Sequence, residues 1–172
     1  MTNNLTTGNP YRNTLHYEYP QDIPESYADI VEELRTKAQD VRSTHIKKAS
    51  SGNVAVAKLE LATGRVYRKE ATSKKKPINI PGEKNGPQLL FFPRIDRASL
   101  NNNYNKEHAE YKLFNALAED LEGDSVPSDA TGRLYLYTEM QMCSGCNTTC
   151  DEDFGRLFPN IEVIIFYKEP YP

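Results

Sequence analysis

The chain has 172 residues, enough to bury a hydrophobic core within one domain. No apolar run approaches the roughly 20 residues that span a bilayer, so we expect no part in the membrane. Residues 1–20 contain no hydrophobic stretch, which argues against a secretory signal peptide there. The net charge of −3 hides an excess of six basic residues in 1–106 and of nine acidic residues in 107–172.

The first half of the chain predicts a lead-in, a helix and a hairpin. Residues 1–20 show no periodicity, which predicts an extended or poorly ordered lead-in before a single domain over 21–172. Apolar residues recur at three- and four-residue spacing from Pro24 to Val41, which predicts a helix. Residues 53–61 predict a strand, and 65–69 its returning partner.

The faces of the strand 53–61 follow from its alternation. One face would carry Ala55, Ala57, Leu59 and Leu61, and the other Val54 and Val56. A long polar connection follows over 71–87, and the apolar run 88–92 is either a strand or a packed loop. The densest basic stretch lies in 65–76 and includes Lys74, Lys75 and Lys76. Such a run is either a solvated surface or a rim that binds a polyanion.

The second half alternates helices with strands. We expect a helix over about 105–121, a strand over 133–138, a helix over 143–158 and a strand over 161–167. The last of these is nearly all apolar and β-branched, as is typical of a central strand buried on both faces. The alternation predicts an α/β fold in which the last strands are parallel.

Two short segments in this half carry side chains suited to metal chemistry. His108 and Glu110 fall at the start of one predicted helix, and Cys143 and Cys146 open another. A helix N-terminus stabilises thiolates, and cysteines three residues apart can bind one ion. One imidazole and two thiolates would leave a fourth zinc position for water, with the Glu110 acid beside it. This equipment suits hydrolytic loss of ammonia from an amidine-like carbon. The remaining thiol, Cys150, is either a buried apolar group or an accessory ligand.

These segments match a known signature. His108-Ala109-Glu110 and Cys143-Ser144-Gly145-Cys146 correspond to the H-x-E and C-x-x-C motifs of zinc nucleobase deaminases. Together with the order of elements, they make residues 50–168 resemble the cytidine deaminase-like superfamily, and most nearly its bacterial polymorphic-toxin deaminases. Further similar segments are Gly52-Asn53-Val54-Ala55, Tyr137-Thr138-Glu139 and Phe158-Pro159-Asn160-Ile161.

The resemblance implies a fold and a site. The fold would be a three-layer α/β/α sandwich around a mixed sheet of four to five strands. The fifth strand would be missing, very short or supplied by another segment. Zn²⁺ would be bound by His108, Cys143 and Cys146, with Glu110 as the proton shuttle. Met142 stands where the family has proline, which bears on the rigidity of the loop before the cysteines.

Three further residues have two interpretations each. Asn53 is expected to face the substrate pocket, or else it is a turn residue that begins a strand. Thr138 and Glu139 either shape the pocket-side end of their strand or cap that end.

The resemblance also suggests a substrate and partners. We expect deamination of cytosine to uracil in DNA, single- or double-stranded, with Lys74, Lys75 and Lys76 contacting phosphates. The alternatives are RNA, a free nucleoside or nucleotide of salvage metabolism, and a structural zinc or redox module without catalysis. A toxin-type enzyme implies a cognate immunity protein, delivery as the C-terminal part of a secreted toxin, and action in the cytoplasm of the producing or target cell. We expect a monomer.

Overall fold

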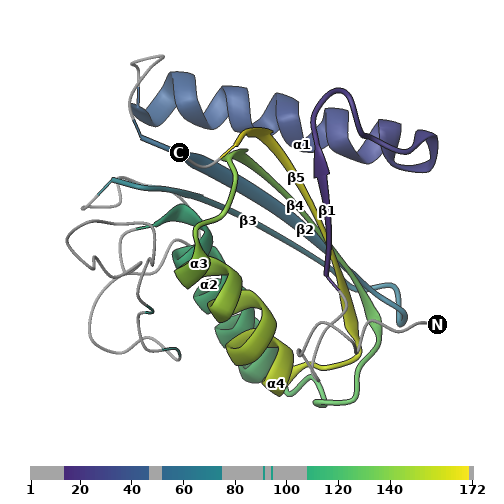
Figure 1. Cartoon of the computed structure of the whole chain (residues 1–172). Coiled ribbons are helices and arrows are strands. Elements are labelled where there is room, and N and C mark those ends of the chain that lie inside the picture. The colour runs from purple at the N-terminus through teal and green to yellow at the C-terminus, as the bar shows by residue number, and fades with distance from the viewer. Residues whose placement is uncertain (1–13, 47–51, 75–90, 92–93, 95–107, 171–172) are drawn as a thin grey trace.

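The computed structural model describes residues 14–46, 52–74, 91, 94 and 108–170. These residues form three layers around one mixed sheet (Figure 1). Helix α1 (Ala28–Val41) covers one face, while α2 (Ala109–Gly123) and α3 (Ser144–Thr148) cover the other. The predicted α/β sandwich with a mixed sheet is therefore confirmed.

Five strands make up the sheet, in the order β1-β5-β4-β2-β3. They are β1 (Thr14–Glu18), β2 (Val54–Leu61), β3 (Val66–Thr72), β4 (Gly132–Met140) and β5 (Ile161–Glu169). Strand β2 is antiparallel to β3 and to β4, whereas β4 and β1 each run parallel to β5. The expectation that the last strands of the chain are parallel is thus confirmed.

The fifth strand comes from the N-terminal segment. Residues Thr14–Glu18 form β1 at the edge of the sheet, in register with Val163 to Tyr167 of β5. Of the two expectations for the lead-in, an extended segment is confirmed for residues 14–18 and a poorly ordered one is wrong there, so the domain begins before residue 21. Residues 1–13 lie outside the described part. The backbone hydrogen bonds of β1 are made to a strand about 150 residues away in sequence, so no local sequence pattern predicts this strand.

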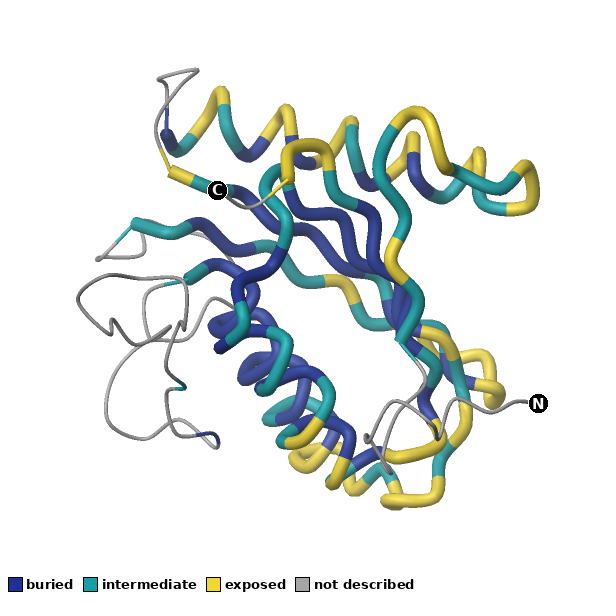
Figure 2. The backbone as a smooth tube through the Cα atoms, viewed as in Figure 1, coloured by how far each residue is buried: buried dark blue, intermediate teal, exposed yellow. Residues whose placement is uncertain are grey.

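The sheet separates two hydrophobic clusters, and buried positions follow its strands (Figure 2). The α2 side contains Ala55, Ala57, Leu59 and Leu61, and the α1 side contains Val54 and Val56, as the alternation of β2 predicted. Strand β5 contributes Val163 and Ile165 to one cluster and Ile164 and Phe166 to the other, so it is buried on both faces.

The helices agree with prediction except at their ends. A 3-10 turn (Glu25–Tyr27) leads into α1, and a π turn (Arg42–Ile46) follows it. The predicted helix over 143–158 consists of three consecutive pieces: α3, a π turn (Thr149–Phe154) and α4 (Gly155–Leu157). Among the described residues, no helix is both long and apolar enough to span a membrane.

Between Lys74 and His108, the structure describes only Phe91 and Arg94 of the connection from β3 to α2. Phe91 is buried, and its backbone N–H donates to Asn115 Oδ1 at 3.0 Å while its carbonyl accepts from the Tyr111 hydroxyl. Arg94 donates two hydrogen bonds to Asp153 in the π turn beyond α3. The rest of the segment 88–92, expected to be either a strand or a packed loop, lies outside the described residues. Phe91 therefore contacts α2, and Arg94 contacts the π turn that follows α3.

Candidate active site

Three potential metal ligands meet where α2 and α3 begin. His108 and Cys143 are the N-caps of these helices, and both have extended backbones with ψ of 141° and 171°. Cys146 lies one turn into α3. The Nδ1 atom of His108 is 3.3 Å from Cys143 Sγ and 3.5 Å from Cys146 Sγ. All three ligand atoms lie within 4.8 Å of one another.

The chemistry and spacing of these atoms suit zinc. Tetrahedral Zn²⁺ with ordinary Zn–S and Zn–N bond lengths would place sulfur and nitrogen ligands about 3.6 Å apart. The observed separations of 3.3 and 3.5 Å are close to this value. Three protein ligands of this kind are also the usual set at catalytic zinc, which keeps one position open. The donor atoms of His108, Cys143 and Cys146 are therefore compatible with zinc, and zinc binding by them stays a prediction.

The surroundings of Cys143 favour its thiolate form. A hydrogen bond from Cys146 and another from His108 outweigh burial and lower the pKa of the Cys143 thiol to about 5. The backbone N–H of Cys146 also points at Cys143 Sγ, at 3.4 Å. The group is therefore poised in the state that binds metal. Cys150 is fully buried in the core on the same side of the sheet.

Glu110 lies beside the ligand cluster and is only 3% exposed. Its Oε2 atom accepts hydrogen bonds from Thr138 Oγ1 at 2.7 Å and from Asn53 Nδ2 at 3.0 Å. Its Oε1 atom lies on the side of the cluster, 3.9 Å from Cys146 Sγ. Burial raises the pKa of Glu110 above the usual value for a glutamate, although the Thr138 hydrogen bond opposes this.

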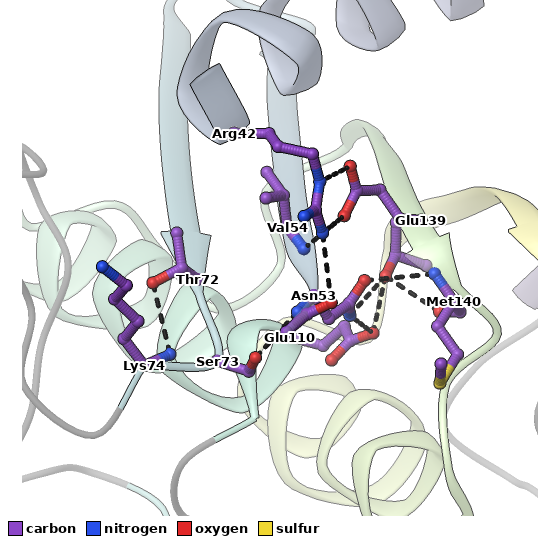
Figure 3. Close-up of polar contacts among 11 residues, drawn as sticks. Arg42, Asn53, Val54, Thr72, Ser73, Lys74, Glu110, Glu139 and Met140 are labelled. Atoms are coloured by element: carbon purple, nitrogen blue, oxygen red, sulfur yellow. Dashed lines mark hydrogen bonds and ion pairs between the residues drawn. The ribbon is translucent and has the colours of Figure 1, made fainter. Parts of the chain in front are cut away.

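Asn53 and Thr138 join Glu110 to the sheet. Figure 3 shows the side chain of Asn53 beside that of Glu110. The Asn53 amide also donates to Thr138 Oγ1 at 3.0 Å, and its Oδ1 accepts from the Met140 N–H at 3.1 Å. Gly52, just before Asn53, has a φ of 70°, a conformation that glycine adopts readily. For Asn53 and Thr138, one of the two interpretations placed the residue at the pocket, and the structure places both side chains against the carboxylate of Glu110.

Most of the chain matches one family of deaminases. The model of the Toxin-deaminase family, described as the BURPS668_1122 family of deaminases, matches residues 31–169. The chain belongs to this deaminase family. The family is part of the cytidine deaminase-like superfamily and occurs in polymorphic toxins, which confirms the resemblance read from the motifs. No curated protein matches the chain.

Glu139 follows Thr138 in β4, and neighbouring residues of a strand face opposite sides of the sheet. Because Thr138 contacts Glu110, Glu139 points away from Glu110. Its carboxylate accepts two hydrogen bonds from the Arg42 guanidinium, at 2.5 and 2.7 Å, and one from the Val54 N–H at 3.1 Å. Arg42 also donates to the Gly52 carbonyl at 3.1 Å. Sequence reasoning missed Arg42, which is 97 residues away from Glu139 and belongs to no motif.

The described part of the basic stretch makes contacts within the deaminase itself. The Lys74 ammonium donates to the His45 carbonyl at 2.6 Å, and the side chains of Arg65 and Lys69 pair with Asp124 and Asp120 of the α2 segment. These contacts favour a solvated surface over a polyanion rim for this part of the stretch. Lys75 and Lys76 lie outside the described residues, so their expected phosphate contacts stay a prediction.

A buried lysine in α2 was also missed. Lys112 lies one helical turn after His108, and its side chain is fully buried. Its ammonium donates to the Thr72 carbonyl at 2.8 Å and to the Lys74 carbonyl. It therefore ties the C-terminal end of β3 to the helix that carries Glu110. In the sequence, the only indication that Lys112 is buried was its position among apolar residues of the predicted helix.

Proposed function

We propose that this deaminase hydrolyses cytosine to uracil in nucleic acid, with DNA as its polymer and Zn²⁺ as its metal. The observation that carries the proposal is the setting of Glu110. Its carboxylate is buried, Asn53 and Thr138 both hold Oε2, and Oε1 lies beside the ligand cluster. A carboxyl group held in one orientation can exchange protons with a reacting group beside the ligand cluster.

The reaction breaks one C–N bond and forms one C–O bond at C4 of the base. Zinc, when bound, supplies a water of lowered pKa as the nucleophile. Glu110 would take one proton from the attacking water and deliver it to ring N3, and would then carry the second proton of that water to the exocyclic nitrogen, which leaves as ammonia. The raised pKa of Glu110 suits this role, because the carboxyl can hold the proton between the two transfers.

The choice of a polymer is supported by the family, which occurs in polymorphic toxins. A toxin of this kind would act on nucleic acid in the cytoplasm of a target cell, and a cognate immunity protein would cover the mouth of the site. Because Lys74 is engaged by a backbone carbonyl, we assign the expected phosphate contacts to Lys75 and Lys76.

The test measures zinc content and the appearance of uracil with purified protein. The substrates are single-stranded DNA, duplex DNA, RNA and free cytidine, each at matched cytosine concentration. The Glu110→Gln variant keeps the shape and the acceptor oxygen of the side chain but loses the proton exchange. Glu60→Gln, at a partly exposed glutamate of β2, is the matched control.

We expect about one zinc ion per chain, and uracil in DNA with wild type and Glu60→Gln but not with Glu110→Gln. Zinc without deamination of any substrate would contradict the enzymatic proposal. Activity confined to cytidine would point to a nucleoside deaminase, and activity confined to RNA would replace DNA as the polymer.

A further inference from the structure

A cavity opens at the same end of the sheet as the candidate active site. Its volume is about 330 Å³, and it lies on the α1 side of the sheet, at the ends of β4 and β5. We call it the α1-side cavity. Its lining includes Tyr19, Tyr137 and Lys168. The cavity is therefore on the opposite face of the sheet from Glu110.

The α1-side cavity and the active site share two residues. Asn53 and Met140 line the cavity, while the Asn53 amide donates to Glu110 and its Oδ1 accepts from the Met140 N–H. The Arg42–Glu139 pair stands next to this junction (Figure 3). Asn53 thus separates the cavity from Glu110, the proposed proton shuttle. A nucleic-acid strand that crosses this edge of the sheet could reach both sites.

The lining contains a buried hydroxyl for which the described residues offer no hydrogen-bond partner. Tyr137 is only 2% exposed, and its phenol makes no hydrogen bond to any described residue. Its ring meets that of Tyr19 edge to face, with centroids 6.2 Å apart. Burial and the nearby Glu139 raise the pKa of Tyr137 to about 12, so the phenol stays a neutral donor. Buried polar groups are nearly always paired, which indicates that this hydroxyl meets a ligand or water in the cavity.

The charges around the cavity are mixed. Arg35 and Arg42 are neutralised by Glu32 and Glu139, respectively. Lys168 is exposed and forms no ion pair within the described part of the chain. The lining thus offers aromatic surface, donors and acceptors, and a cation at its rim. Such a mixture fits the edge of a nucleobase together with one phosphate better than it fits a bare anion.

We propose that the α1-side cavity binds the nucleotide next to the target base in the same strand. The Tyr137 hydroxyl bonds the edge of the neighbouring base, and the Lys168 ammonium contacts its phosphate. This inference rests on the proposed function, since it requires a polymeric substrate. Its consequence is that the deaminase prefers some neighbours of the target cytosine over others.

The experiment uses a pool of DNA oligonucleotides in which one cytosine has every combination of flanking bases, and sequencing reports uracil at that cytosine. Tyr137→Phe removes only the hydroxyl and is compared with Tyr17→Phe, a change on the same face outside the cavity lining. Lys168→Ala is compared with Lys37→Ala, at a lysine of α1 outside the cavity lining.

A second measurement does not depend on activity. Affinity for a fluorescent thymidine oligonucleotide, which contains no target base, is followed over a range of salt concentrations. We expect Lys168→Ala to lower the slope of log affinity against log salt by about 0.7, the value for one phosphate contact in a single strand. Lys37→Ala should leave the slope unchanged.

We expect Tyr137→Phe to reduce the ratio between the best and worst neighbours by about three- to tenfold, the size of one net hydrogen bond. Its melting temperature should not fall, because the lost hydroxyl has no partner within the described protein. Uracil formed with the same neighbour preference in wild type and Tyr137→Phe overturns the subsite but leaves the proposed function intact. If wild type and Lys168→Ala bind the thymidine oligonucleotide with the same salt slope, the phosphate contact is overturned, whatever the deamination result.

Discussion

The ion pair of Arg42 and Glu139 allows a quantitative test of how the site is held. The two side chains are 18% and 22% exposed, so the pair is neither a surface contact nor a fully buried one. Exposed pairs contribute up to about 1 kcal/mol, and breaking a buried pair costs about 3–5 kcal/mol. We therefore expect a coupling free energy of about 2 kcal/mol between these residues.

The assay is a double-mutant cycle of Arg42→Met and Glu139→Gln, with unfolding followed in denaturant. Glutamine keeps an acceptor for the Val54 N–H, so the cycle isolates the charged pair. The matched control is the cycle of Arg35→Met and Glu32→Gln, a helix-surface pair whose glutamate is 49% exposed. Its coupling should not exceed about 0.5 kcal/mol.

Activity supplies a second readout. Glu139 follows Thr138, and Val54 follows Asn53, so the pair anchors the strand ends that hold Glu110. Loosening these ends should lower kcat about tenfold with little change in KM, because misplacement of a catalytic group by 1 Å can cost about a hundredfold. A coupling near zero together with a raised KM and normal kcat would refute this reasoning and return Glu139 to a substrate-binding role.

Three other changes test the site from different directions. Folding raises the pKa of Glu110, so the stabilising contribution of its carboxyl is present at low pH and is lost as pH rises through the folded pKa. Glu110→Gln should therefore stabilise the metal-free protein more at pH 7 than at pH 4, and equal effects in melts at both pH values would contradict a buried carboxylate. Chelation should destabilise wild type by about 4 kcal/mol relative to protein with zinc at a thousand times its Kd, and Cys146→Ala should abolish the response of the melting temperature to chelator. Lys112→Met should cost about 1–3 kcal/mol in denaturant melts by leaving two carbonyls without their donor, and a neutral result would show that water replaces it.

The sequence by itself determined the parts of the protein that depend on local spacing. His108 and Glu110 share the first turn of α2, and Cys143 and Cys146 open α3, as their positions before helical patterns predicted. The alternation along β2 correctly assigned its two faces, because the side-chain period of a strand is two. The family also followed from these short motifs.

Only the tertiary structure decided how distant segments meet. Strand β1 pairs with β5 across the length of the chain, and Arg42 pairs with Glu139 across 97 residues, and neither contact leaves a periodic trace in the sequence. The amide of Asn53 reaches Glu110 only because β2 lies beside β4 above the start of α2. The ammonium of Lys74, expected to contact phosphate, donates to the carbonyl of His45, 29 residues away in sequence. Periodicity reports which face of an element is buried, whereas the identity of the partner is fixed only when the layers pack together.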